Sequence, residues 1–191
     1  MNTHRKLLIF LLLLCSLPMA ARAAEPDLKQ WVGSVDHMVM LRHARAPGTG
    51  DPPNFRLGDC STQRNLSSEG REQAVRIGER LRAAGLAITK VYSSQWCRCQ
   101  ETARNLAAGP VVELPALNSF FEAPDLERGQ TEALRAWIAS ADLSRPVVLV
   151  THQVNITALT GIVPAEGEIL ILRREPGKLH VVARFPDNGR R

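Results

Sequence analysis

Short apolar segments alternate with segments of helical periodicity along most of the chain, and this alternation restricts the fold more than any other feature of the sequence. Ala74, Ile77 and Leu81 recur on one helix face, and Gly85 marks the end of that helix. Alternating strands and helices predict an α/β sandwich with a mostly parallel sheet. The expected strands are residues 35–41, 89–93, 111–114, 147–150, 168–173 and 179–184, and the expected helices are residues 68–84, 95–108, 131–139 and 154–160.

The last two predicted strands are joined only by a short turn around Pro176 and Gly177. A parallel crossover needs a dozen or more residues, so we expect this edge of the sheet to be antiparallel. In sheets of this kind, sites lie beyond the carboxyl ends of the strands. The polar residues that follow the strands are therefore the ones to consider for function.

The N-terminus has the three parts of a secretory signal peptide. Arg5 and Lys6 form a basic start, residues 7–17 are almost entirely apolar, and residues 21–23 form a small-residue cleavage pattern. The apolar run is too short for a comfortable membrane span. We expect residues 1–23 to be removed and residues 24–191 to form one periplasmic or secreted domain without stable membrane insertion. An uncleaved N-terminal anchor is the alternative.

The net charge of +5 belongs in part to this leader. Cleavage after Ala23 would remove three cations and no acids, which leaves a formal charge of +2. The remaining acidic and basic residues are interleaved along the predicted helices, as they are on solvated helix faces. We therefore expect no nucleic-acid partner.

Cleavage also leaves three cysteines, Cys60, Cys97 and Cys99. In an oxidising compartment an odd number indicates one disulfide and a free thiol, or an intermolecular bond. We favour a Cys60–Cys97 disulfide, and three free thiols are the alternative. Cys97 and Cys99 have the close spacing of metal ligands, but no matching ligand cluster occurs elsewhere, so we expect no metal site.

Three predicted strands end in side chains that suit an anion. The first ends at Arg42 and His43, the second leads to Arg98, and the most apolar strand ends at His152. Guanidinium groups brought together repel one another unless an anion lies between them, and arginine binds phosphate oxygens through a planar fork. A neutral imidazole among cations keeps its lone pair free and can act as a nucleophile. The strand ends therefore predict a phosphate site.

Four segments, in this order, resemble the motifs of the histidine phosphatase superfamily, the phosphoglycerate mutase-like group (branch 1). They are Leu41-Arg42-His43-Ala44, Asn65-Leu66-Ser67-Ser68-Glu69-Gly70 with Gln73-Ala74, Ser93-Ser94 with Arg98 and Thr102-Ala103, and Val148-Leu149-Val150-Thr151-His152. The resemblance implies a three-layer α/β/α sandwich with a mostly parallel sheet and an antiparallel edge strand. It also implies a phosphoric monoester hydrolase of the histidine acid phosphatase type.

The same resemblance assigns roles to four residues. His43 takes up the phosphoryl group as a phosphohistidine, Arg42, Arg98 and His152 hold its oxygens, and water then releases phosphate. The resemblance implies neither a metal nor a cofactor.

Several positions depart from the family pattern. Ala44 and Arg45 stand where the family often has glycine and an acidic residue, and Gln153 stands where it often has glycine. Arg45 and Gln153 are candidate substrate-binding residues. Arg56 and Arg64, in or near the Pro- and Gly-rich loop, are expected to be solvated, although either could line the mouth of the site.

The general acid is the least defined part of the predicted site. Glu122 is the first candidate and Asp125 the second, because both lie in the loop where the family places this group. The spacing does not match the family's usual acidic motif, so a solvent-exposed loop carboxylate is the alternative for Glu122. Without an acid, the protein would suit substrates with good leaving groups, such as phosphohistidine.

These observations lead us to expect a metal-independent phosphohydrolase acting on a small-molecule or envelope phospho-substrate in an open pocket. Two other functions remain. One is a mutase of the same fold, which needs a retained bisphosphorylated pool that an exported protein would lack. The other is a non-catalytic phosphate-binding envelope module, which the four intact core residues disfavour.

Overall fold

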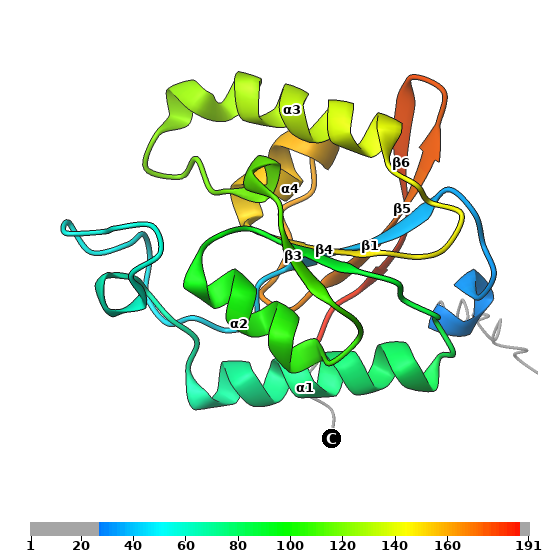
Figure 1. Ribbon diagram of the computed structural model, residues 1–191, viewed down its shortest axis with the longest axis horizontal. Coiled ribbons are helices and arrows are strands. Elements are labelled where there is room, and N and C mark those ends of the chain that lie inside the picture. Colours follow the sequence, from blue (N-terminus) through cyan, green and yellow to red (C-terminus); the bar gives the residue numbers. More distant parts are fainter. Residues whose placement is uncertain (1–26, 188–191) are drawn as a thin grey trace, which may run out of the picture.

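The computed structural model describes residues 27–187 and confirms the three-layer α/β/α architecture. One six-stranded sheet, with strand order β3-β2-β4-β1-β5-β6, lies between two pairs of helices. Helices α1 (Ser68–Ala83) and α2 (Cys97–Leu106) cover one face, and α3 (Glu127–Ser140) and α4 (Gln153–Thr160) cover the other (Figure 1). The predicted signal peptide, residues 1–23, lies outside the described residues and stays a prediction.

Four neighbouring strands form the parallel part of the sheet. They are β3 (Val111–Glu113), β2 (Val91–Ser93), β4 (Val148–Thr151) and β1 (His37–Arg42). Because β1 and β4 pair in parallel with Arg42 opposite Thr151, their carboxyl ends lie side by side. The topology therefore brings the predicted site residues to one edge of the sheet.

The other side of the sheet is antiparallel, as the short connector predicted. Strand β5 (Ile169–Glu175) runs antiparallel to β1 and forms a hairpin with β6 (Lys178–Phe185). The turn between them contains Gly177, whose φ of 70° lies in the left-handed region that glycine adopts readily. The antiparallel part thus comprises two strands, with β5 inside the sheet and β6 at its edge.

The core consists of two apolar layers, one on each face of the sheet. Val39 and Leu41 of β1 contribute to the layer beneath α1 and α2, whereas Met38 and Met40 contribute to the layer beneath α3 and α4. Successive side chains of a strand point to opposite faces, so a strand covered on both sides is apolar throughout. This is why the central strands read as continuous apolar runs.

Helix boundaries differ from the expectation mainly at α3, which begins at Glu127 rather than at residue 131. Its first turn contains Gly129 and only exposed or half-buried side chains, so no apolar periodicity marks it. The helix is preceded instead by a 3-10 turn, Pro124–Leu126. Helix α1 begins where predicted, because the Ser67 hydroxyl accepts a hydrogen bond from the Gly70 amide at 3.0 Å.

A long loop between β1 and α1, residues 43–67, projects beyond the layered body (Figure 1). Its one regular turn is a short 3-10 helix, Cys60–Thr62. The predicted disulfide joins Cys60 of this loop to Cys97 at the start of α2, and Cys99 is buried with a free thiol. The cross-link therefore holds the loop against the helix that carries Arg98.

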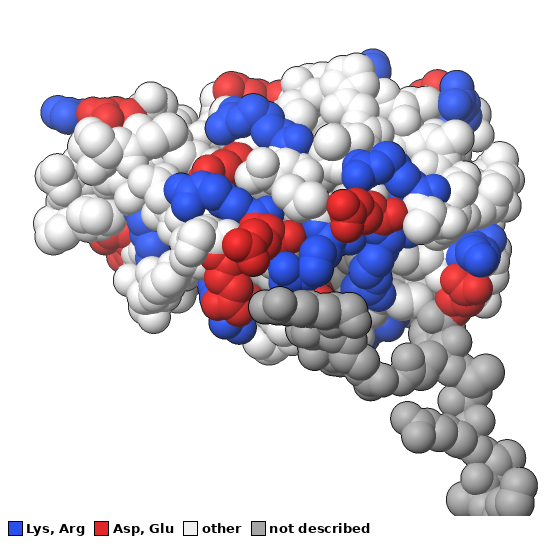
Figure 2. All heavy atoms as spheres, turned by 90° about the horizontal axis from the view of Figure 1, so that it is seen from below, with Lys and Arg blue, Asp and Glu red and all other residues white. Residues whose placement is uncertain are grey.

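The face covered by α1 carries basic and acidic side chains side by side (Figure 2). Arg71 pairs with Glu101 at 2.6 Å, and Arg45 pairs with Glu69 at 2.7 Å. Such mixed, solvated pairs form no single-sign patch. Among residues 27–187, no helix has the length and apolar character needed to cross a membrane.

Candidate active site

The carboxyl ends of β1, β2 and β4 meet around a cavity of about 110 Å³. The amide of His43 donates to Thr151 O at 2.9 Å, and the amide of Ser94 donates to Val150 O at 3.0 Å, so the polar residues after each strand stay in register. The cavity is lined by Arg42, His43, Arg64, Arg98, His152 and Gln153, together with Gly48, Thr49, Gly50, Ser119, Phe121 and Val154.

His43 is held in the form that a nucleophile requires. Its side chain is buried, with 2% of the residue exposed, and Nδ1–H donates to Ala44 O at 2.9 Å. In the neutral ring this leaves the lone pair on Nε2. Burial and then the charges of Arg98 and Arg42 hold the pKa of His43 well below its ordinary value, although the Ala44 hydrogen bond opposes them. The imidazole is therefore neutral around pH 7.

His152 lies opposite His43, with ring centroids 5.5 Å apart. Its Nε2 is 2.9 Å from Ser94 Oγ, which ties the ring to the end of β2. Burial, the neighbouring His43 and the Arg98 charge hold the pKa of His152 well below its ordinary value. The Cys99 thiol also contacts the ring at 3.4 Å, and burial raises the pKa of this thiol to about 12, so it remains protonated.

Arg42 and Arg98 are each held by groups behind them. Arg42 Nη1 donates to Pro164 O at 3.0 Å, and its Nη2 is 3.7 Å from Glu166. Arg98 Nη1 donates to Asp51 at 2.8 Å. Within the described residues, the buried Nε of Arg42 and that of Arg98 have no hydrogen-bond partner. Unpaired buried donors are costly, and an oxyanion in the cavity would satisfy them.

The other motif residues support this arrangement rather than line the cavity. Thr102 Oγ1 accepts from the Ala44 amide at 3.0 Å and donates to Arg98 O at 2.7 Å, which links the loop after His43 to α2. Gly70 packs so closely on the backbone carbonyl of Arg45 that a Cβ atom there would overlap it. These motif residues thus hold the segment after His43 against α1 and α2.

Of the predicted substrate-binding and acid residues, some lie at the cavity and others lie away from it. Gln153 lines the cavity at the first turn of α4, whereas Arg45 is half exposed and pairs with Glu69 away from it. Glu122 is exposed, and its carboxylate reaches the backbone of Gly50, a lining residue, so it lies at the rim. Asp125, exposed in the following 3-10 turn, is not among the lining residues.

Three residues of the site had no clear sequence signal. Arg64, which the sequence left as either solvated or lining the mouth of the site, lines the cavity and is held by the carbonyl oxygens of Ala46 and Gly50. Asp51 and Glu166 are the carboxylates behind Arg98 and Arg42, and both lie in loops outside the four motifs. Nothing in the local pattern around these acids distinguishes them from solvated loop residues.

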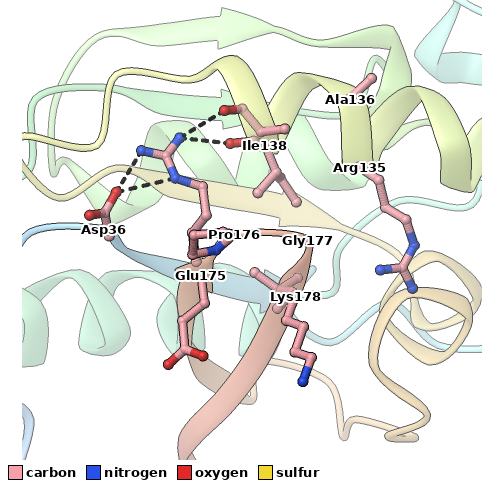
Figure 3. A pocket seen from close by; sticks show the side chains of 11 residues that line it. Asp36, Arg135, Ala136, Ile138, Glu175, Pro176, Gly177 and Lys178 are labelled. Carbon is pink, nitrogen blue, oxygen red and sulfur yellow. Dashed lines mark hydrogen bonds and ion pairs between the residues drawn. The ribbon is translucent and has the colours of Figure 1, made fainter.

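A larger cavity, of about 620 Å³, lies at the opposite end of the sheet, beside the start of β1 and the β5–β6 turn (Figure 3). Its half-buried cation, Arg174, is already engaged. Arg174 donates to Asp36 at 2.6 Å and to the carbonyl oxygens of Ile138 and Ala141 at 2.9 and 2.7 Å. Arg174 therefore closes the end of α3, and this cavity contains none of the predicted site residues.

Metal-binding side chains do not cluster in the part of the chain that the structure describes: no group of three or more His, Cys, Asp or Glu could hold an ion. The two neutral histidines of the site are surrounded by guanidinium groups, which disfavour a cation between them. The donor set instead suits an anion.

Comparison with known proteins finds similarity to phosphatases, which bind a phosphate anion. Residues 38–122, somewhat less than half of the chain, match the profile of the Histidine phosphatase superfamily (branch 1). It is 33% identical over 88 residues to the serine/threonine-protein phosphatase Pgam5, mitochondrial, of Drosophila virilis. That match covers 46% of this chain and spans only 28% of the fly protein.

Solved structures share the fold. SixA from Agrobacterium tumefaciens has a TM-score of 0.55 at 16% identity and covers 80% of this chain and 99% of its own. The protein histidine phosphatase SixA complexed with tungstate has a TM-score of 0.54 at 15% identity, covering 78% and 96%. A mycobacterial glucosyl-3-phosphoglycerate phosphatase has a TM-score of 0.55 at 20% identity, covering 78% and 98%.

Proposed function

We propose that this protein is a phosphohydrolase in which His43 carries the phosphoryl group as a covalent intermediate. The observation that carries the proposal is the geometry of His43: a buried neutral imidazole whose Nε2 lone pair is free, among arginines with unpaired donors. The match of residues 38–122 to the superfamily profile and the likeness to phosphatases support the reaction class.

In the first step, His43 Nε2 would form a bond to phosphorus as the bond from phosphorus to the leaving oxygen breaks. Arg42, Arg98 and His152 would bind the three non-bridging oxygens, and the leaving oxygen would receive a proton. In the second step, water would attack phosphorus, the phosphorus–nitrogen bond would break, and orthophosphate and neutral His43 would be restored. Both steps depend on positioning and charge stabilisation.

The proposed reaction is independent of a metal ion or cofactor because the guanidinium groups supply the positive charge. Arg42, Arg64 and Arg98 all line the cavity, and arginine keeps its charge throughout the physiological range. Gln153 and Val154 form the first turn of α4 at the same cavity, where the helix adds partial positive charge. These groups together would stabilise the charge of the transferring phosphoryl group.

We propose Glu122 as the general acid that protonates the leaving oxygen. Its carboxylate lies beside Gly50, which lines the cavity. Its exposure means that substrate must bring the leaving oxygen within hydrogen-bond reach before the acid can act. Asp125 does not line the cavity and is the weaker candidate.

The proposed substrate is a small-molecule or envelope phospho-compound, and the proposed location is periplasmic or secreted. The location rests on the leader-like residues 1–23. The breadth of the substrate class rests on the rim, where Phe121 is 50% exposed beside the cavity and offers an apolar surface to a leaving group. The relatives act on different substrates by name, so none of their substrates is transferred to this chain.

The first experiment is phosphate release from para-nitrophenyl phosphate across pH 4 to 8 with EDTA present, for wild type and His43→Ala. Activity that survives EDTA and is lost in His43→Ala supports the proposal, as does a protein-bound phosphoryl label that is stable in alkali and lost in acid, as a phosphohistidine is. Activity retained in the variant would overturn it. Phosphate binding without turnover of any monoester would indicate a phosphate-binding module, and phosphoryl transfer to a second acceptor would indicate a mutase.

A further inference from the structure

We infer that Asp51 is a positioning residue that sets the orientation of Arg98 for the oxyanion. The inference rests on the proposed function, because it concerns how the same anion site is assembled. Asp51 belongs to none of the four motifs and lies on the projecting loop, 47 residues before Arg98 in the sequence. It would act through Arg98 and would not contact the substrate.

The carboxylate of Asp51 is the meeting point of three donors. Oδ1 accepts from Arg98 Nη1 at 2.8 Å and from the Arg64 amide at 3.0 Å, and Oδ2 accepts from Trp96 Nε1 at 3.0 Å. The Arg98 and Asp51 side chains are 3% and 6% exposed. Burial acts to raise the pKa of Asp51, but the hydrogen bonds from Arg98, the Arg64 amide and Trp96, together with the Arg98 charge, outweigh it and lower the pKa, so the carboxylate is charged at neutral pH. A buried charged pair of this kind has one well-defined geometry.

The rest of the loop holds Asp51 in place. The Cys60–Cys97 disulfide joins the loop to the residue before Arg98, and Gln63 Oε1 accepts from the Cys97 amide at 2.9 Å. Phe55 stacks on Trp96 with ring centroids 5.1 Å apart. These contacts make the loop a rigid support for Asp51. Arg98 Nη1 is thereby anchored on the loop side, while Nη2 lies 3.5 Å from His152 Nδ1 and Nε remains without a partner.

Neutralising Asp51 has two opposite effects on the affinity of the cavity for an anion, one through charge and one through the orientation of Arg98. By Coulomb's law, removal of a negative charge next to the cavity strengthens the binding of an anion. Loss of the anchor lets the Arg98 fork leave its productive orientation, which weakens binding, because a misplacement of about 1 Å can cost two orders of magnitude. Because Asp51 receives three hydrogen bonds in a buried position, we expect position to dominate.

The test measures tungstate binding, as a phosphate analogue, by calorimetry on the full mature protein. Asp51→Ala should weaken tungstate binding at least about tenfold, and the shape-conserving Asp51→Asn should weaken it less. In an Arg98→Lys background, the effect of Asp51→Ala should shrink to less than about twofold, because the residue has lost the group through which it acts. Circular dichroism verifies that each variant is folded.

The matched control is Asp36→Asn, which removes a carboxylate–guanidinium pair of 2.6 Å, to Arg174, at the other end of the sheet. It should leave tungstate affinity unchanged. Tighter or unchanged tungstate binding by folded Asp51→Ala and Asp51→Asn would overturn the inference and leave the proposed function intact. A wild-type protein that binds no tungstate would overturn the proposed function, and the inference with it.

Discussion

The two ends of the sheet each contain a half-buried or buried arginine paired with an aspartate, yet only one of these arginines lies in the proposed anion site. At the amino end, Arg174 uses all of its nitrogen atoms on Asp36 and on the carbonyl oxygens that end α3. At the carboxyl end, Arg98 uses Nη1 on Asp51 but keeps a buried Nε without a partner. The two arginines carry the same charge. They differ in whether every N–H donor of the guanidinium has a hydrogen-bond partner within the protein.

This difference in unpaired donors indicates, within residues 27–187, which of the two cavities suits a ligand. A buried donor without an acceptor costs about 1–3 kcal/mol, and two such donors, the Nε groups of Arg42 and Arg98, belong to side chains that line the same cavity. Cavity size points the other way, since the amino-end cavity is the larger at about 620 Å³, against about 110 Å³ for the site. The unsatisfied donors specify a ligand chemistry, whereas a volume does not.

Removing each arginine in turn is the strongest test of whether Arg98 and Arg174 have different roles. Arg98→Ala should lower turnover by about three orders of magnitude, because it removes charge stabilisation at the transferring phosphoryl group. Arg174→Ala should lower the free energy of unfolding by about 2 kcal/mol and leave turnover per folded molecule within about twofold. Steady-state kinetics and urea unfolding of both variants provide the check. Equal kinetic effects at the two ends would remove the distinction.

The disulfide distinguishes the two ends further, because it fastens only the loop at the carboxyl end. Cys60→Ser/Cys97→Ser should lower the free energy of unfolding by about 3–4 kcal/mol, since the two cysteines are 37 residues apart and the unfolded chain gains freedom. Denaturant unfolding with and without dithiothreitol measures this. Reductant should weaken the wild type by a similar amount and leave the double variant unchanged; a wild type unaffected by complete reduction would contradict the prediction.

The role of the cavity rim can be tested through Glu122, the proposed general acid. Glu122→Gln should reduce turnover of alkyl phosphates by about 10–100-fold and change turnover of para-nitrophenyl phosphate less, because a good leaving group needs less protonation. Comparison of kcat for the two substrate classes is the measurement. Asp125→Asn is the matched control and should affect neither class. If Glu122→Gln reduces both classes equally, the residue has another role.

The two neutral histidines should also make stability depend on pH. Their pKa values are lower in the folded protein than in the unfolded chain, so the unfolded chain binds more protons once the pH falls below about 6.5. Stability should therefore be full above that pH and decline below it, by up to about 1.4 kcal/mol per pH unit for each histidine. Urea unfolding from pH 7 to pH 5 tests this, and His43→Gln should make the decline shallower. An unchanged slope in His43→Gln would assign the pH dependence to other groups.

Much of the fold follows from the sequence because its signals are local. The apolar run at residues 147–150, the Ser67 cap and the turn at Gly177 each depend on a few neighbouring residues, and each has its predicted structure. The start of α3 was predicted four residues late because its first turn lacks an apolar stripe. Local physics thus locates elements well where they bury side chains and poorly where they do not.

The sequence by itself also named the quartet Arg42, His43, Arg98 and His152, because each lies at or shortly after the end of a predicted strand and within a segment that resembles a family motif. Only the tertiary structure decided what surrounds them. Asp51, Arg64 and Glu166 come from irregular loops, where no periodicity links a residue to its neighbours in space. Their places depend on long-range contacts that close loops of tens of residues, and such contacts leave no pattern in the sequence.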